Sequence, residues 1–331
     1  MAIRWGILGS GKISQRNMVP AMLAADNADV IACMDIDKNT ARDVAEKFSI
    51  PKYYTTSKEL LTDKDIQAIY VATPVYLHAE KVIEAAKHGK HVLCEKPMAL
   101  TLQDCKEMMA ACRANNVHLA MGFMLRFHPH HLKAKELIDS GAIGQIVKAR
   151  VQWNFMFPPQ EGVWSHDPAL SGGGSLMDVG VHGIDLLRFL VGDIEEVSAL
   201  SSNVVFPFLV EDAATVLLKF RNGSHGLIET SFAVDTKNSP NGVEIYGTKG
   251  VITTQKTVSC FVGGTMKTCI DGEEQSYPVS EVINYQKEVE SFGRKIESRE
   301  PCTIDENGLE SLRVILAAYE SAKLKKTVCL T

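Results

Sequence analysis

Apolar residues in the first third of the chain follow two alternating periods. Short runs of β-branched and aliphatic residues are each followed by a longer segment in which apolar residues recur every three or four positions. The strand-like runs are Ile3–Leu8, Val30–Met34, Ala68–Ala72, His91–Cys94 and His118–Gly122, and the helix-like segments include Thr40–Phe48, His78–His88 and Leu102–Asn115. This alternation predicts an α/β fold with a doubly wound parallel sheet of the Rossmann type, in which ligands bind at the carboxyl ends of the strands.

The pattern changes after residue 123. A helical segment near His131–Ser140 precedes longer strand-like runs, which are joined by turn signals such as Arg221-Asn222-Gly223. The runs are Ile146–Phe155, Val197–Asn203, Ala213–Phe220, His225–Phe232 and Gly242–Tyr246, and a final helical segment covers Gly308–Lys323. We therefore predict two domains, residues 1–123 and 124–331, the second with a mostly antiparallel sheet.

Composition narrows the class of protein. The chain has 331 residues, 45% hydrophobic and 23% charged, with a formal net charge of -5, which argues against nucleic acid as a partner. Eight cysteines are scattered singly, as is typical of free thiols in a reducing compartment. No signal-peptide pattern and no apolar run of roughly 20 residues is present, so we expect a cytoplasmic protein without a membrane partner.

The first strand-like run leads into the sequence GILGSGKIS. Gly9 and Gly11, with Ser14 in the third place, match the G-x-G-x-x-G fingerprint between a strand and a helix. Gly9 permits a tight turn, and Gly11 lets the backbone approach a pyrophosphate at the helix N-terminus. The loop, including Lys12 and Ile13, is a predicted dinucleotide site; an ordinary strand-to-helix turn is the alternative.

An acidic residue follows the second strand-like run. Asp35 stands where a carboxylate would accept hydrogen bonds from the adenosine ribose hydroxyls and repel a 2′-phosphate, so NAD is favoured over NADP. An unengaged surface acid is the alternative. Asp37 is better explained as the N-cap of the next helix.

Two further stretches carry reactive side chains. In HVLCEKP, Glu95, Lys96 and Pro97 follow a strand, where a lysine can donate to a substrate oxygen and favour alkoxide character; a solvated lysine is the alternative.

In SGGGSLMDVGVHGIDLLRFLVG, three glycines predict a flexible entry to a helix, and Asp178, His182 and Asp185 would share one face. A histidine beside a carboxylate suits proton transfer near neutral pH, and a buried pair that only supports the fold is the alternative.

Together these stretches resemble the Gfo/Idh/MocA oxidoreductases, the glucose–fructose oxidoreductase and inositol dehydrogenase family. The resemblance covers the chain and includes GILGSGKIS, VATPVYLHAE, HVLCEKPMALT, MGFMLRFHP and the glycine-led helix, in the family's order. It implies an NAD(P)-binding Rossmann domain followed by a substrate-binding and oligomerisation domain, an α/β domain with a large, mostly antiparallel open sheet. Because the open sheet of this family often forms the subunit interface, we expect a homo-oligomer, a dimer or a tetramer.

The resemblance also implies roles for individual residues. His182 would be the general base, while Lys96 and Asp178 would orient and polarise the substrate. Thr73, Pro74 and His78 would lie near the nicotinamide, with Glu95 and Lys96 also at the cofactor. Val75 stands where the family often has asparagine, so one polar contact is in doubt.

Substrate contacts are predicted from the segments that follow. Arg126 would meet the substrate or serve as a structural arginine. Aromatic and polar side chains that suit a sugar ring are Trp153, Asn154, Phe155, Trp164 and His166, with core packing as the alternative for each. The histidines of Phe127–His131 fit no metal-ligand spacing, so no metal site is predicted.

The chain is thus predicted to transfer a hydride between a nicotinamide cofactor and a secondary hydroxyl or ketone of a sugar, polyol, inositol or anhydrosugar. An NAD-dependent glycoside hydrolase or lyase, which oxidises its substrate transiently and does not consume the cofactor, is the main alternative. A non-catalytic nucleotide sensor is disfavoured because both Lys96 and His182 are present.

Overall fold

The computed structural model describes residues 2–160, 162–207, 209–279, 281–298 and 301–330. The chain divides into two compact units. The first comprises Met1–Met124 and Tyr285–Leu309, and the second comprises Leu125–Asn284 and Glu310–Thr331. The predicted boundary after residue 123 therefore assigns Tyr285–Leu309 to the second domain, whereas in the structure this segment belongs to the first unit.

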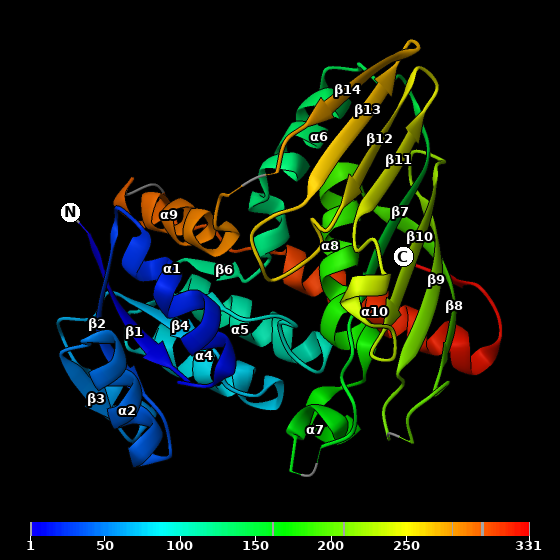
Figure 1. Cartoon of the computed structure of the whole chain (residues 1–331). Coiled ribbons are helices and arrows are strands. Elements are labelled where there is room, and N and C mark those ends of the chain that lie inside the picture. The colour runs from blue at the N-terminus through cyan, green and yellow to red at the C-terminus, as the bar shows by residue number, and fades with distance from the viewer. Residues whose placement is uncertain (1, 161, 208, 280, 299–300, 331) are drawn as a thin grey trace. The chain divides into compact units, whose positions relative to one another are not determined.

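The first unit contains a six-stranded sheet in the order β3-β2-β1-β4-β5-β6 (Figure 1). All neighbouring strands run parallel, which confirms the predicted doubly wound sheet. The strands are β1 (Ile3–Leu8), β2 (Ala28–Met34), β3 (Lys52–Tyr54), β4 (Ala68–Val71), β5 (His91–Cys94) and β6 (Leu119–Met121). Because β1, β4 and β5 are adjacent, the loops at their carboxyl ends lie at one edge of the sheet.

Helices connect these strands, and their starts follow local capping rules. Asp37 caps α2 (Lys38–Phe48) by accepting hydrogen bonds from the backbone N–H groups of Asn39 and Thr40, as expected from the sequence. Thr56 and Glu59 form a capping box at the next one. The helices are α1 (Val19–Ala24), α2 (Lys38–Phe48), α3 (Ser57–Thr62), α4 (His78–Lys87) and α5 (Leu102–Ala114).

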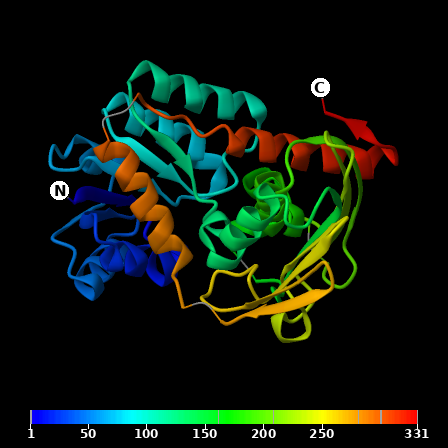
Figure 2. The same ribbon diagram turned by 90° about the horizontal axis from the view of Figure 1, so that it is seen from above.

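Helix α9 (Asn284–Glu297) completes the first unit from far along the chain (Figure 2). The ring of Phe292 lies 5.8 Å from that of the fully buried Trp5 on β1. The Asn27 side chain donates to the carbonyl of Glu290 at 3.1 Å. The sheet therefore gains an apolar cover that no neighbouring segment of the sequence supplies.

The second unit contains a nine-stranded sheet in the order β14-β13-β12-β11-β7-β10-β9-β8-β15. Only β7 and β10 pair in parallel; the other pairs are antiparallel, which confirms the predicted mostly antiparallel sheet. The strands are β7 (Ile146–Asn154), β8 (Ile194–Ser202), β9 (Ala213–Phe220), β10 (His225–Ser231), β11 (Val243–Gly247), β12 (Gly250–Gln255), β13 (Thr265–Ile270), β14 (Glu273–Tyr277) and β15 (Val328–Cys329).

The two faces of this sheet differ. Helices α6 (Pro129–Asp139), α8 (Val181–Leu190) and α10 (Asn307–Leu324) lie on one side of it, and the short α7 (Pro168–Ser171) precedes α8 (Figure 1). At Gly183 the helix α8 comes so close to the sheet that an added Cβ would lie 2.9 Å from the Val151 side chain. On the opposite face, Leu217 and Leu200 are 58% and 77% exposed.

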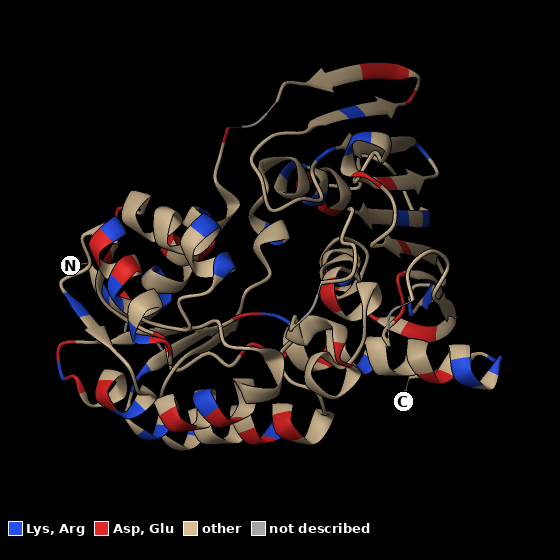
Figure 3. Ribbon diagram, turned by 60° about the horizontal axis from the view of Figure 1, so that its bottom comes forward, with Lys and Arg blue, Asp and Glu red and all other residues tan. Residues whose placement is uncertain are grey.

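Charged residues are distributed over both units. Figure 3 shows Lys and Arg interspersed with Asp and Glu along the helices, in line with the modest net charge. All eight cysteines are free thiols. Within the described ranges, none of the helices has the length and apolar character that crossing a bilayer requires.

Candidate active site

The glycine loop follows β1 in the first unit. Gly9 has a φ of +106°, and a Cβ on it would lie 2.6 Å from the backbone oxygen of Ala72, so only glycine fits this turn. An added Cβ on Gly11, in contrast, would meet no atom within 4 Å. The exposed backbone at Gly11, Lys12 and half-exposed Ile13 opens directly into helical structure. The loop therefore leaves open space at the start of a helix, as a bound pyrophosphate requires.

Asp35 lies beside this loop at the end of β2. One of its carboxylate oxygens accepts the backbone N–H of Ser10 at 3.1 Å, and the other accepts that of Asp37 at 3.0 Å. The carboxylate is therefore held against the glycine loop and is not an unengaged surface acid. Each oxygen keeps a lone pair that a ribose hydroxyl can use.

The loops after β4 and β5 are joined by His78. Its Nδ1 lies 2.9 Å from the carbonyl oxygen of Pro97, and its Nε2 lies 2.9 Å from that of Thr73. The ring is buried, and burial lowers its pKa below the ordinary 6.5, although the carbonyl oxygens of Pro97 and Thr73 act in the opposite direction. His78 thus ties together two loops at the cofactor edge; direct contact with a nucleotide stays a prediction.

Thr73 offers a polar atom without a partner. Its Oγ1 is buried and has no hydrogen-bond partner among the described residues, while the next two residues are half-buried Pro74 and buried Val75. Buried hydroxyl groups are generally hydrogen-bonded, so an unpartnered one points to a missing group. With the open space at Gly11 and the carboxylate of Asp35, the residues of this unit fit a bound dinucleotide.

Glu95 and Lys96 follow β5. The buried carboxylate of Glu95 accepts the hydroxyl of Tyr70 and, at 3.2 Å, the backbone N–H of the half-exposed Lys96. The Lys96–Pro97 peptide bond is cis. Burial, and then the nearby Glu95 carboxylate, raise the pKa of Tyr70 well above its ordinary value, so the phenol keeps its proton and donates. Tyr70 supports the lysine loop, and sequence reasoning missed it because it reads as an ordinary core residue of β4.

In the second unit, Asp178 and His182 lie on one continuous helical segment. It begins with a π-helical turn, Leu176–Gly180, and continues as α8. The sequence predicts ordinary helix here; π-turns widen the helix locally and occur often at functional sites. Asp178 is half-buried, whereas His182 is only 3% exposed. Because a π-turn has more residues per turn than an α-helix, Asp178 lies at a different angle around the helix axis than a regular 3.6-residue period would give.

Two contacts from other elements reach this helix, one at His182 and one at Asp185. The indole of Trp153 lies 5.1 Å from the His182 ring, centroid to centroid, at 37°. Arg126 donates from Nε and Nη2 to the two oxygens of Asp185, both at 2.7 Å. Asp185 therefore partners an arginine, which gives Arg126 the structural role considered as its alternative; its role toward a substrate stays a prediction.

The other predicted substrate residues differ in their surroundings. Trp164 is 40% exposed, and the half-buried His166 packs against Phe157, with the ring centroids 4.8 Å apart and the ring planes tilted by 55°. Buried Asn154 donates to the Ser239 hydroxyl at 3.0 Å, so its side chain serves the fold. Phe155 packs edge-on against Phe232 at 5.1 Å.

Two of the three glycines before Asp178 are tightly packed, which contradicts the prediction of a flexible entry. A Cβ on Gly173 would lie 1.9 Å from the Tyr319 hydroxyl oxygen, and one on Gly174 would lie 1.9 Å from the backbone oxygen of Glu211. These glycines are needed for close packing. Glu211 and Tyr319 were missed from the sequence because they come from the β8–β9 connection and from α10, far along the chain.

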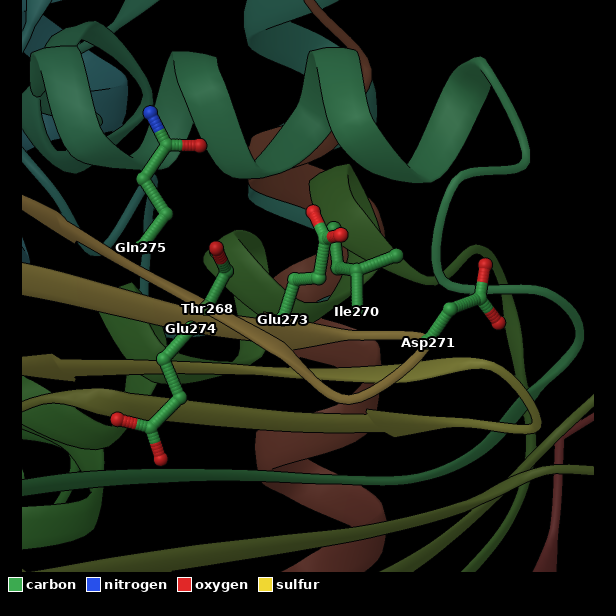
Figure 4. Close-up of a pocket in the computed structure, with 6 residues that line it drawn as sticks. All are labelled: Thr268, Ile270, Asp271, Glu273, Glu274 and Gln275. Atoms are coloured by element: carbon green, nitrogen blue, oxygen red, sulfur yellow. The ribbon is translucent and has the colours of Figure 1, made fainter.

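A separate hollow lies on the hairpin of β13 and β14. It has a volume of about 570 Å³. Figure 4 shows its lining residues, Thr268, Ile270, Asp271, Glu273, Glu274 and Gln275. None of them is a predicted site residue. The lining residues include three carboxylates and no Lys or Arg. We therefore assign no ligand to this hollow.

Both parts of the chain match known protein families. Residues 3–123 match the model of the oxidoreductase family with an NAD-binding Rossmann fold, and residues 131–253 match the Gfo/Idh/MocA C-terminal domain. A 1,5-anhydro-D-fructose reductase of Ensifer adhaerens is 31% identical over 96% of both chains. A myo-inositol 2-dehydrogenase of Thermotoga maritima is 29% identical over 98% of both.

A solved structure of similar fold is the aldose-aldose oxidoreductase from Caulobacter crescentus complexed with glycerol. It has a TM-score of 0.91 and 28% identity, with both chains covered completely. The identity to the reductase over nearly the whole length, together with the two family matches, makes this chain a member of the Gfo/Idh/MocA oxidoreductase family, with an NAD-binding Rossmann fold in its first part.

Proposed function

We propose that the protein is an NAD-dependent dehydrogenase or reductase that acts on a secondary hydroxyl or ketone of a sugar, polyol, inositol or anhydrosugar. The observation that carries the proposal is the meeting of three loops at the carboxyl edge of the first sheet. Lys96 follows β5, next to the Thr73 loop of β4, and His78 joins these two loops. The glycine loop follows β1, which is the neighbour of β4 on its other side. A cation at this edge is suited to a substrate oxygen next to the nicotinamide.

The residues that hold the cofactor are those of the strand-end loops. Backbone at Gly9, Gly11, Lys12 and Ile13 faces the pyrophosphate, and Asp35 accepts from the adenosine ribose. Thr73 and Pro74 lie at the nicotinamide half, where the free Oγ1 of Thr73 gains a partner. When bound, the nicotinamide exchanges a hydride with the substrate carbon.

The acid–base steps fall to side chains of this chain. In the oxidative direction, His182 takes the proton of the substrate hydroxyl at an imidazole nitrogen, and Asp178 orients the ring or the substrate. Lys96 donates a hydrogen bond to a substrate oxygen and stabilises its developing negative charge. Trp153 packs against the His182 ring on one side. Reduction of a ketone returns the proton from His182.

The substrate class rests on the named relatives, an anhydrofructose reductase and an inositol dehydrogenase. The exposed Trp164 and half-buried His166 offer an apolar face and a polar edge to a ring with several hydroxyls, and Arg126 lies on the same unit. We place the protein in the cytoplasm, in line with eight free thiols, and assign it no nucleic-acid partner.

A homo-oligomer forms through the outer face of the nine-stranded sheet in this proposal. The exposed Leu200 and Leu217 lie there near Arg150, which pairs with Glu229 and Glu244. Light scattering of wild type and Leu217→Glu tests this part, because a charge on a buried interface disrupts association. A wild-type monomer would contradict it.

The test of the enzymatic proposal is absorbance of reduced nicotinamide. Purified protein is offered sugars, inositols and anhydrosugars, each with NAD and with NADP, and Lys96→Ala is the matched control. We expect a signal with NAD that the variant loses. A signal with NADP alone would contradict the cofactor assignment. Product without net NADH, from protein purified with bound nucleotide, would instead support a redox-assisted glycosidase.

A further inference from the structure

The start of the helix that bears Asp178 and His182 is bound by one distant residue. Glu211 lies between β8 and β9 and is 8% exposed. One of its carboxylate oxygens accepts the N–H of Gly174 and the other that of Leu176, both at 2.9 Å. Its backbone carbonyl accepts the N–H of Ser175 at 3.1 Å. Three successive amide groups therefore bind to a single residue.

These amide groups are the ones that a helix cannot satisfy by itself. The first N–H groups of a helix have no intrahelical partner, and a carboxylate there also interacts favourably with the helix dipole. Most helices in this chain with a described cap use a residue at or next to their own start, as Asp37 and Thr56 do. The segment of Asp178 instead takes its cap from a strand connection of the sheet.

Tyr319 on α10 holds the carboxylate from the other side. Its hydroxyl donates to the same oxygen that accepts from Leu176, at 2.9 Å. Burial, and then the Glu211 carboxylate, raise the pKa of this phenol well above its ordinary value, so the phenol remains a donor. The close approach of both residues to Gly173 and Gly174 leaves no room for a side chain at either glycine.

We propose that Glu211 and Tyr319 are positioning residues for the proposed reaction: they fix the axial position of the helix that carries Asp178 and His182. Asp178 lies two residues beyond Leu176, and its N–H bonds to the carbonyl of Gly174 at 2.9 Å. A shift at residues 174–176 is therefore passed directly to Asp178 and along the same helix to His182. Misplacement by 1 Å at a reacting centre can lower a rate roughly 100-fold.

Stability alone does not explain an acid at this place. Burial raises the pKa of Glu211 above the ordinary 4.5, and this effect exceeds the lowering by its four hydrogen bonds. The folded protein thus holds the charged form at a cost, which a neutral residue would not have. What the carboxylate provides is geometry, because its two oxygens accept from several donors at once.

The adjacent residue supplies a matched control. Asp212 is fully buried and also binds three backbone N–H groups, those of Val204, Val205 and Phe206, at 2.6–2.8 Å. It holds a loop with exposed apolar side chains and makes no described contact with the helix of His182. Asp212→Asn and Glu211→Gln therefore remove equivalent acceptors from two different segments.

The experiment compares Glu211→Gln, Tyr319→Phe and Asp212→Asn in the full chain. We expect Glu211→Gln to lower kcat about 10- to 100-fold, with the KM for NAD within about twofold. The reason is that the NH₂ group of glutamine would face a backbone N–H, so one of the two hydrogen bonds to Gly174 and Leu176 is lost. Tyr319→Phe removes one donor only and should give a smaller loss of the same kind. Asp212→Asn should leave kcat unchanged, although it can lower Tm.

A second readout does not depend on turnover. Imidazole signals of isotope-labelled histidine, with His182 assigned from a His182→Asn protein, are followed against pH by NMR. Glu211→Gln should shift the titration or the chemical shift of His182, and Asp212→Asn should not. If no substrate is ever found but this shift occurs, the proposed function fails and the positioning role stands.

Three results would overturn the positioning role. One is wild-type kcat and wild-type His182 signals in Glu211→Gln. Another is an equal loss of kcat in Asp212→Asn. The last is a Tyr319→Phe protein that loses kcat only in proportion to its loss of folded protein, measured by Tm and by circular dichroism.

Discussion

The two units present their functional side chains in different ways. In the first unit, each candidate residue lies within a few positions of a strand end, and its main contacts come from the same or the neighbouring loop. Asp35, for example, binds Ser10 and Asp37. In the second unit, the helix of Asp178 and His182 depends on residues from other elements, including Glu211, Tyr319 and Trp153 on β7.

The difference follows from the architecture of the two sheets. A parallel sheet brings the carboxyl ends of its strands to one edge, so short local motifs meet there without further support. A helix lying across an open antiparallel sheet has no such edge, and its position along the sheet must be fixed by tertiary contacts. The position of a site on a helix is therefore set by residues distant in sequence, whereas that of a site on strand-end loops is set by neighbouring residues.

The largest expected effect is on kcat, and it tests whether catalysis and NAD binding depend on different units. His182→Asn removes the proposed base and should lower kcat about 1,000-fold, since general acid–base catalysis contributes about 100- to 10,000-fold. Because the nucleotide loops belong to the first unit, the Kd for NAD should stay within about twofold of wild type, as measured by quenching of protein fluorescence. Asp35→Ser should do the reverse, weakening NAD with little change in kcat. A large rise in the NAD Kd of His182→Asn would contradict this separation.

The next effect concerns tertiary support of the same helix. Asp185 is 1% exposed and pairs with Arg126 through two hydrogen bonds of 2.7 Å. Removing one partner of a buried ion pair costs about 3–5 kcal/mol, so Asp185→Asn should lower the free energy of unfolding by roughly 3 kcal/mol in urea titrations. The surface pair Arg42–Asp43 is the control, because Asp43→Asn should change stability by less than about 0.5 kcal/mol. Equal effects of the two substitutions would refute the structural importance of the buried pair.

Two glycines of one loop should respond differently. Gly9→Ala forces a side chain into a backbone at φ +106°, beside the oxygen of Ala72, and should destabilise the protein by about 1–3 kcal/mol. Gly11→Ala meets open space, so it should leave Tm unchanged and weaken NAD binding by obstructing the pyrophosphate. Calorimetry gives both the Tm and the Kd. Unchanged NAD affinity in Gly11→Ala would place the pyrophosphate elsewhere.

The smallest effect is a dependence of stability on pH in the second unit. Burial lowers the pKa of His128 to about 4 and that of His131 to about 3, and both face His130 and backbone oxygens. The unfolded chain binds these protons near pH 6.5, so the stability present above that pH is lost as pH falls toward the folded values. By pH 6 the loss should be about 1 kcal/mol for each ring.

Chemical denaturation between pH 8 and 5.5 measures this slope. His131→Gln keeps a hydrogen-bonding side chain without the titration, and should reduce the slope by about one proton's contribution. A slope that does not change in His131→Gln would show that this ring is protonated in the folded protein.

Much of the fold could be predicted from the sequence because its strands carry strong local signals. Ile3–Leu8, His91–Cys94 and Ala213–Phe220 have the predicted bounds, since each is a continuous or alternating apolar run. The β13–β14 hairpin was missed although Asp271-Gly272 is a hairpin signal, because its strands are short and largely polar. Helix α9 is amphipathic, but nothing in its own residues indicates that it returns to the first sheet.

The sequence by itself determined the parallel sheet, and it predicted the glycine loop with Asp35 and the candidate chemistry of Lys96, Asp178 and His182. Each of these rests on a short stretch of residues adjacent in the chain, where a local pattern is enough to single it out. Only the tertiary structure decided that Asp185 serves Arg126, that Trp153 packs on His182, and that the glycines before Asp178 seat Glu211 and Tyr319. Such contacts join residues that are far apart in sequence, and a side chain's partner across that distance is set by packing rather than by local pattern.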